Sequence, residues 1–145
     1  MTNKELYREF CQTNGDLPLF MTDWWMDAVC AGKQWDVLLS FHEDGSIQAA
    51  LPYLIRKRLW MRYIVMPQQT QIGGIWLRED VANTPDKVTT ICQLFAEQLS
   101  ALKLHYYYQH YPIHSAAVED MRTLGFTTKE RITYRIEDLS DLDKV

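Results

Sequence analysis

Apolar residues recur along this chain with two different periods, and the changes between the periods predict the order of its elements. From Val88 to Leu102, apolar side chains follow one another at three- and four-residue spacing, which indicates a helix with one buried face. Thr84, Pro85 and Asp86 stand before this stretch as an N-cap, a first-turn proline and a first-turn acid. The pattern therefore predicts a long helix that begins near residue 85.

Two shorter helices are predicted before the first strand. Residues 4–12 place Leu6, Phe10 and Cys11 on one helical face. A second helix is predicted over residues 23–30, where an N-capping Thr or Asp precedes apolar positions at helical spacing.

Strands follow in the middle of the chain. Residues 35–41 are rich in strand-forming side chains, and the Asp-Gly pair within 43–46 predicts a hairpin turn. The returning strand is predicted over 47–59, with Pro52 at a bulge or an edge position because proline cannot donate to a ladder. A third strand is predicted over 60–66.

The remaining pattern alternates extended and helical segments. The predicted elements are a loop at 67–74, a brief extension at 75–77, a strand at 104–108, a helix from 114 or 115 that Gly125 caps, and a final strand at 131–136. Antiparallel strands followed by a strand–helix–strand crossover predict an α/β (α+β) fold, with a mixed, mostly antiparallel central sheet flanked by helices.

Length and composition favour a single domain. The chain has 145 residues, of which 47% are hydrophobic, enough for one core. We expect one domain over residues 1–136, with the acidic segment 137–145 as a tail or as a linker toward a second half.

Charge and hydropathy narrow the function classes. A net charge of −4 argues against general nucleic-acid binding, although it leaves room for a local basic patch. No run of apolar residues is long enough for a membrane span, and the N-terminus has no signal-peptide pattern. The three cysteines include no CxxC pair and are expected to be reduced. Together these features predict a soluble, cytoplasmic protein.

Several short motifs add a family resemblance. The order of elements resembles the GNAT acyltransferase fold. The segments 17–20 (LPLF), 24–29 (WWMDAV), 50–53 (ALPY) and 62–67 (RYIVMP), followed by the Gln-rich loop 68–74, resemble the N-terminal half of FemA/FemB-like proteins. The resemblance covers most of the chain.

The resemblance implies the transfer of an acyl or aminoacyl group to a small-molecule or peptide amine, from acyl-CoA or aminoacyl-tRNA. In that family two GNAT-like halves occur together, so this chain is expected to be the acceptor-binding or non-catalytic half, with no cofactor of its own required. A complete small acetyltransferase that uses acetyl-CoA is an alternative. A non-enzymatic domain that self-associates as a homodimer is another, because exposed strand edges and surplus tryptophans favour association.

The loop around Gln71, Gly73 and Gly74 is the candidate cofactor-binding site. It matches the first half of the Gln-x-x-Gly-x-Gly/Ala loop that cradles the pyrophosphate of acyl-CoA in GNAT proteins, but Ile75 and Trp76 stand where a small residue belongs. The predicted long helix also begins about ten residues later. The alternative is a turn that leads into a short strand.

Tyr106 and Tyr108 are the candidate catalytic residues. Alternation in a strand places both on one side and Tyr107 on the other. In GNAT-like sites a tyrosine can serve as general acid to the leaving thiolate. The alternative is a pair of sheet aromatics whose hydroxyls reach solvent.

Substrate contacts are predicted at Trp25, Arg56, Arg58 and Arg62. The arginines form a basic cluster that suits a phosphate or an acidic substrate, or they are solvated charges at the end of a strand.

Other polar residues suggest weaker sites. Asp23 and Asp27 lie one helical turn apart and can contact an amine, or they belong to a solvated first turn. His110 and His114 are separated by a proline and no HExxH pattern is present, so no metal site is predicted.

Overall fold

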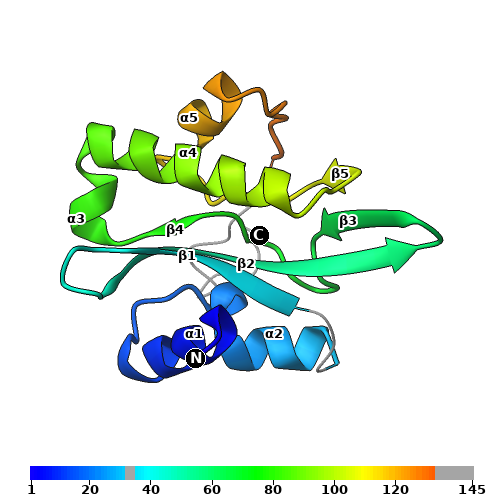
Figure 1. The fold of residues 1–145 in the computed structure, drawn as a ribbon, viewed down its shortest axis with the longest axis horizontal. Helices are drawn as coiled ribbons and strands as arrows, with labels where there is room; N and C mark the ends of the chain where they lie inside the picture. Colours follow the sequence, from blue (N-terminus) through cyan, green and yellow to red (C-terminus); the bar gives the residue numbers. More distant parts are fainter. Residues whose placement is uncertain (32–34, 133–145) are drawn as a thin grey trace, which may run out of the picture.

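A computed structural model describes residues 1–31 and 35–132 of the chain, and these form a sheet with helices on both faces (Figure 1). In chain order the elements are α1 (Asn3–Thr13), η1 (Leu19–Met21), α2 (Asp23–Val29), β1 (Trp35–Phe41), β2 (Ile47–Arg58), β3 (Met61–Val65), β4 (Trp76–Leu77), α3 (Glu79–Ala82), α4 (Pro85–Ala101), β5 (Tyr106–Tyr107) and α5 (Val118–Thr123). Helices α1 and α2 cover one face, and α4 and α5 lie on the other (Figure 1).

The sheet is mixed and mostly antiparallel, which confirms the predicted fold class. Its strand order is β1-β2-β3-β5, and β4 also pairs with β2. The β1–β2, β2–β3 and β2–β4 pairs are antiparallel, and only β3 and β5 run parallel. The predicted turn joins β1 to β2: Gly45 has a φ of 85°, and the His42 amide donates to the Ser46 carbonyl at 2.8 Å.

One edge of β2 has no strand partner at residues 51–53, and we call this gap the breach. The candidate site lies beside it. β3 pairs with β2 from Leu54 to Arg58, whereas β4 pairs with it only at Ala49 and Ala50. Between them the chain leaves the sheet at residues 66–75 and returns as β4. Pro52 lies at this breach, where its missing N–H leaves no ladder bond unmade, so the predicted edge position is confirmed.

The core has two parts, one on each face of the sheet. The cluster under α4 includes the buried apolar stripe of that helix (Val88, Ile91, Cys92, Phe95 and Leu99), as its spacing predicted. The cluster under α1 and α2 gathers around Trp35, which is 2% exposed. In the first helix Leu6, Phe10 and Cys11 pack against this cluster as predicted, and Tyr7, which the prediction did not include, is fully buried with its hydroxyl donating to the Met21 carbonyl at 2.6 Å.

Several predicted boundaries are wrong by a few residues. Leu59 and Trp60 form the turn between β2 and β3, so neither belongs to a strand. β5 contains only two residues, α5 begins at Val118, and the short helix α3 had no predicted counterpart. Gly125 ends α5 as predicted, with a φ of 103°. Most of the predicted strand 131–136 and all of the predicted tail 137–145 lie outside the described residues.

Polar side chains tie α1 to α2 and β1. Arg8 makes a two-pronged ion pair with Asp27, at 2.6 and 2.7 Å, and the Trp35 indole donates to the same carboxylate at 2.9 Å. The bond from Arg8, reinforced by the one from Trp35, lowers the pKa of Asp27 to about 2. Asp27 is therefore engaged in holding this layer together, and an amine would have to compete with Arg8 for it.

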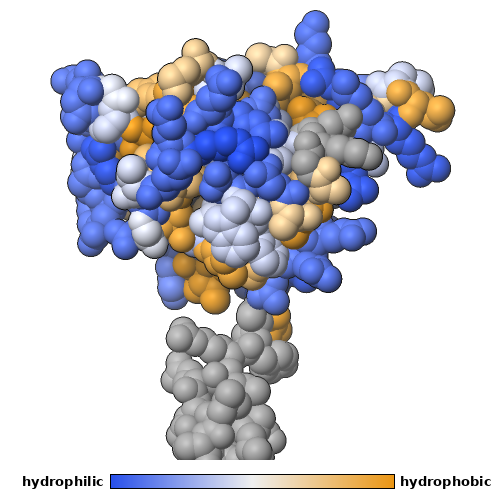
Figure 2. Space-filling view, turned by 90° about the horizontal axis from the view of Figure 1, so that it is seen from below, coloured by the Kyte–Doolittle hydropathy of each residue, from blue (hydrophilic) through white to orange (hydrophobic). Residues whose placement is uncertain are grey.

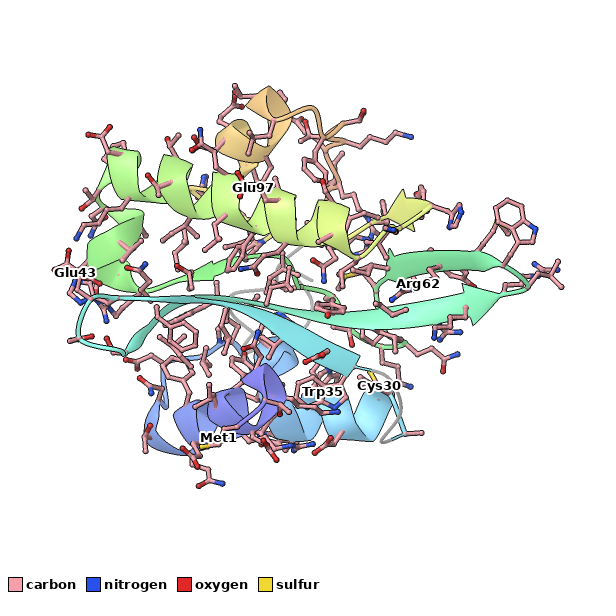
Figure 3. All side chains as sticks on the ribbon, viewed as in Figure 1. Met1, Cys30, Trp35, Glu43, Arg62 and Glu97 are labelled. Atoms are coloured by element: carbon pink, nitrogen blue, oxygen red, sulfur yellow. The ribbon has the colours of Figure 1, made fainter. Side chains whose placement is uncertain are left out.

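Figure 3 shows where the long side chains gather. The labelled Trp35 points into the layer between the sheet and helices α1 and α2, whereas Glu97 belongs to α4 on the other side (Figure 3).

None of the helices in the described part of the chain has the length and apolar character that a membrane span requires.

Candidate functional site

The loop of residues 66–75 lies against the breach and is held there from both sides of the sheet. From the α2 side, the Trp25 indole N–H donates to the Thr70 hydroxyl at 3.0 Å. Trp25 also packs edge-on against Phe20 and Trp24, with centroids 5.1 and 6.1 Å away. The indole of this predicted substrate contact thus anchors the loop to α2, and only its remaining surface is available to a ligand.

Gly73 and Gly74 are buried in this loop. The Gly73 amide donates to the His110 carbonyl at 2.7 Å, so it does not point at a ligand. Gly74 has a φ of 80°, and a Cβ built on it would lie 2.7 Å from the Tyr111 ring. Gly74 therefore needs glycine for close packing and backbone conformation, whereas a Cβ at Gly73 would lie 3.2 Å from the flexible Met66 side chain. The requirement at Gly74 accounts for that glycine without a bound phosphate.

Residues 107–111 fill the breach from the α4 side. The Gln109 side chain donates to the Pro52 carbonyl at 2.9 Å and accepts from the Tyr107 hydroxyl at 2.7 Å. Tyr107 and Tyr111 share a further hydrogen bond at 3.1 Å, and burial is the largest cause that raises the pKa of both phenols. Both phenols therefore stay protonated, and we call Tyr107, Gln109 and Tyr111 the breach plug.

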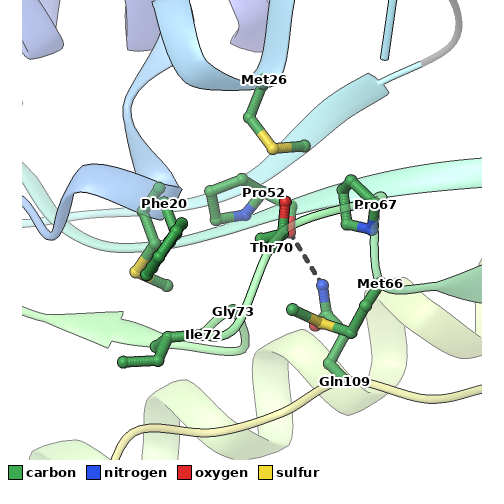
Figure 4. Close-up of a pocket in the computed structure, with 10 residues that line it drawn as sticks. Phe20, Met26, Pro52, Met66, Pro67, Thr70, Ile72, Gly73 and Gln109 are labelled. Carbon is green, nitrogen blue, oxygen red and sulfur yellow. Dashed lines mark hydrogen bonds between the residues drawn. The ribbon is translucent and has the colours of Figure 1, made fainter. Parts of the chain in front are cut away.

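The space left beside the breach plug is very small. A cavity of about 10 Å³ lies between the loop, the breach and the η1–α2 side; Phe20, Met26, Pro52, Thr70 and Gln109 are among its lining residues (Figure 4). The dashed line in Figure 4 marks the Gln109–Pro52 hydrogen bond across its lower part. Such a volume holds about one water molecule. It cannot take the arm of an acyl carrier without movement of the plug.

The candidate general acid Tyr108 lies at the outer side of the same loop. The His110 ring lies between the loop and Tyr108: its Nδ1 is 3.3 Å from the Gln71 carbonyl oxygen, and its Nε2 is 3.0 Å from the Tyr108 hydroxyl oxygen. The Arg131 guanidinium also lies against this ring. Burial and then the Arg131 charge lower the pKa of His110 below 6.5, so the ring is neutral near pH 7.

The structure therefore brings together some of the predicted site residues. Gln71 and Tyr108 meet through His110, as described. Tyr106 and Tyr108 lie on one side of β5 as alternation predicts, with ring centroids 6.3 Å apart and planes 14° from parallel. Tyr107 points to the other side, into the α4 cluster.

The predicted arginine cluster is divided between the two faces of the sheet. Arg56 pairs with Tyr63 and Arg58 with Met61, and these pairs face the α1–α2 side, as the alternation with buried Leu54 requires. Arg62 pairs with Lys57 on the α4 side, where its Nε is buried and has no hydrogen-bond partner among the described residues. Arg62 cannot act with Arg56 and Arg58 on one ligand.

Gln109 was not singled out by the sequence, His110 was considered there only as part of a metal site, and Tyr111 was not among the candidate site residues. Gln109, His110 and Tyr111 connect the loop to the sheet, yet each stands in a stretch without periodicity. The density of polar aromatics at residues 106–111 was the one available signal. Among residues 1–31 and 35–132, no group of three or more metal-binding side chains comes together.

Comparison with known proteins gives similarity only at the level of fold. No family model matches the sequence, and no curated protein matches it. An aminoglycoside 6'-N-acetyltransferase from Acinetobacter baumannii is 13% identical, with a TM-score of 0.47 over 97% of this chain and 96% of its own. A second such enzyme, from Acinetobacter haemolyticus, is 16% identical, with a TM-score of 0.43 over 94% and 92%. A Pyrococcus furiosus protein named as an acetyl transferase is 11% identical, with a TM-score of 0.48 over 92% of this chain and 91% of its own.

Proposed function

We propose that this chain is a GNAT-like, FemA/FemB-related domain of an acyl- or aminoacyltransferase, and that it carries no acyl-CoA site of its own. In this proposal it is the acceptor-binding or scaffold half. Residues 1–136 form the domain and 137–145 lead toward a second half that holds the donor. The resemblance of its motifs and the order of its elements support the superfamily.

One observation carries the proposal: the amide that a phosphate cradle would need is already bonded within the chain. A donor loop aims free backbone N–H groups at a pyrophosphate. Here the Gly73 amide donates to His110, Gly74 is closed off by the Tyr111 ring, and both glycines are buried. The following helix, α3, has only four residues and is separated from the loop by β4. These contacts support a donor site that lies outside this loop.

Thermal unfolding with millimolar acetyl-CoA tests the proposal. A ligand present at 100 times its Kd adds about 2.7 kcal/mol to the free energy of unfolding, which is a clear rise in Tm. We expect no rise beyond that given by adenosine 3',5'-bisphosphate, the control that carries the nucleotide part of CoA without its acyl arm. A rise specific to acetyl-CoA would contradict the proposal.

The contact between Tyr108 and His110 favours a second candidate function, that of a complete small acetyltransferase. Tyr108 is hydrogen-bonded to a neutral His110 at the rim of the loop, which is an arrangement suited to proton transfer. This candidate predicts release of CoA from acetyl-CoA by the chain alone when an amine is supplied, and loss of that release in Tyr108→Phe. A chain that releases no CoA above the uncatalysed rate excludes it.

A further inference from the structure

The sheet has one face that the described helices leave open. Helices α1 and α2 pack against β1 and against Ile47, Ala50 and Leu54 of β2, whereas the outer part of β2, with β3 and β5, extends past them (Figure 1). On the α1–α2 side this extension presents side chains from three adjacent strands. We call the surface made by Arg56, Arg58, Tyr63, Tyr106 and Tyr108 the open sheet face.

The residues of the open sheet face are in register. Arg56 of β2 pairs with Tyr63 of β3, and Tyr63 pairs with Tyr106 of β5, so an arginine and two tyrosines form one row across three strands. Tyr108 follows two residues later on the same side and stacks on Tyr106. Arg58 lies next to this row, toward the end of the hairpin.

The aromatic rings of this row are accessible. Tyr106 is 56% exposed and Tyr108 is 38% exposed, and Tyr63 is half-buried. An exposed tyrosine pair with nearly parallel rings is a surface on which another flat ring can stack. Because these rings face solvent, packing in the hydrophobic core does not explain why aromatic residues stand at these positions.

The charge of the open sheet face has one sign. Arg56 and Arg58 are both exposed, and no carboxylate among the described residues forms an ion pair with either. Asp36 pairs with Tyr53, which faces the α4 cluster, so its carboxylate belongs to the opposite side of the sheet. Seen from the α1–α2 side, the extension projects at the upper right, where hydrophilic side chains border a small hydrophobic group at its tip (Figure 2).

We propose that the open sheet face binds a single strand of nucleic acid, with bases stacked on Tyr106 and Tyr108 and backbone phosphates on Arg56 and Arg58. Stacking aromatics beside a cationic track are the two features that sequence-tolerant single-strand binding requires. A second copy of this chain is a poorer occupant, because a two-fold contact through this face would bring its arginines near their symmetry mates. The overall charge of −4 confines the attraction to this patch.

This inference goes beyond the acyl-transfer proposal and does not depend on it. Binding is measured without any acyl donor or amine, so either proposal can fail while the other stands. The face is also separate from the breach. Among the described residues, the side chains of Arg56, Arg58, Tyr63 and Tyr106 make no hydrogen bond to residues 66–75, and Tyr108 reaches the loop through His110.

Fluorescence anisotropy with a fluorescein-labelled ten-nucleotide oligo(U), and with oligo(dT) of the same length, tests the proposal. We expect saturable binding that weakens with salt, with a slope of log K against log[salt] of about −1.4 for two phosphate contacts to a single strand. Tyr106→Ala is expected to weaken binding about tenfold or more, because it removes a stacking surface. Tyr106→Phe keeps the ring and should keep the affinity.

Variants elsewhere supply matched controls. Phe41→Ala removes an aromatic side chain that is 44% exposed at the far end of β1, and Lys87→Gln removes an exposed cation on α4. Neither should change the affinity, whereas Arg56→Gln with Arg58→Gln should bring the salt slope close to zero. All variants are compared after their Tm values show that they are folded.

Four results would overturn the proposal. The first is no binding at 100-fold molar excess of protein in low salt. The second is binding that the control variants weaken as much as Tyr106→Ala does. The third is equal affinity for inorganic polyphosphate, with no effect of Tyr106→Ala, which would indicate a general anion or acidic-peptide surface. The fourth is a concentration-dependent dimer that Tyr106→Ala abolishes, which would assign the face to a second copy.

Discussion

The breach and the open sheet face both contain residues that the sequence suggested for function, but the structure uses them in opposite ways. At the breach, Gly73 and Gly74 are buried and in contact with the chain's own His110 and Tyr111. On the open sheet face, Arg56 is exposed and has no ion-pair partner among the described residues, and Tyr106 is 56% exposed although it stacks on Tyr108. Residue type alone does not distinguish these two situations.

Residues that already make internal contacts have a structural role, whereas residues without such contacts are available to a ligand. A buried amide that already has an acceptor gains little from a ligand that must first displace it. An exposed ring or cation loses only water when it binds. Substitutions should therefore reduce stability at the breach and leave it nearly unchanged on the open sheet face.

The largest effect is expected from Gly74→Ala. The new Cβ would lie 2.7 Å from the Tyr111 ring at a φ of 80°, and left-handed strain with overpacking together cost about 3 kcal/mol. Tm should fall by roughly 10 °C, measured by circular dichroism. Gly15→Ala is the control, because nothing lies within 4 Å of a Cβ there, and it should be neutral or slightly stabilising. Equal effects of the two changes would contradict the packing described for the breach.

The next effect is expected from Gln109→Ala. It leaves the Pro52 carbonyl without its side-chain donor and the Tyr107 hydroxyl without one acceptor, which costs about 1–3 kcal/mol. Urea unfolding measures the loss. Gln93→Ala, at an exposed position on α4, should change the free energy of unfolding by less than about 0.5 kcal/mol. A loss at Gln109 no larger than this control would show that the plug does not close the breach.

A smaller, pH-dependent effect is expected at His110, which joins the two regions through Tyr108 and Gln71. Burial lowers its pKa below 6.5, so the unfolded chain takes up this proton first as the pH falls. The His110 contribution to stability is therefore complete above about pH 7.5, decreases as the pH falls through 6.5 and levels off below the folded pKa. Urea unfolding between pH 7.5 and 5.5 should show this decrease.

Two histidine variants isolate that effect. His110→Asn should have a flatter stability profile than the parent chain over the same pH range. His114→Asn should retain the parent profile, since His114 is exposed and has a φ of 61°, which asparagine tolerates. A parent profile that His110→Asn leaves unaltered would refute the role of this ring.

The smallest effect is expected on the open sheet face. Arg56→Gln and Arg58→Gln together should change the free energy of unfolding by less than about 0.5 kcal/mol, because no described ion pair is lost. Chemical unfolding of the double variant measures this. A loss above about 1 kcal/mol would mean that these arginines stabilise the fold, and the contrast between the two regions would disappear.

Local pattern predicted most of the fold. The apolar positions at helical spacing and the Thr-Pro-Asp sequence before them predicted the bounds of α4 to within a residue. The Asp-Gly pair correctly predicted the turn between β1 and β2. Both features depend on neighbours within a few positions. Boundaries failed where the signal was short, as at β5 and α3.

The candidate site was predicted less well because it depends on distant pairs. Gln109 meets Pro52 across 57 positions, and the Gly74–Tyr111 contact joins two loops. No local periodicity encodes such contacts, so the Gly-Gly pair suggested a phosphate loop where the structure shows close packing. Alternation did place Tyr106 and Tyr108 on one side, since that depends on β5 alone.

A two-dimensional ¹H–¹⁵N NMR titration with acetyl-CoA shows whether the loop of residues 66–75 binds the acyl donor, because it observes the Gly73 and Gly74 amides themselves. With the Gly73 amide bonded to the His110 carbonyl and Gly74 buried against the Tyr111 ring, both amide signals should stay unshifted up to millimolar ligand, even if signals of the open sheet face move. Saturable shifts of the two glycine amides, absent with adenosine 3',5'-bisphosphate, would show that the loop binds the acyl donor and would contradict the account.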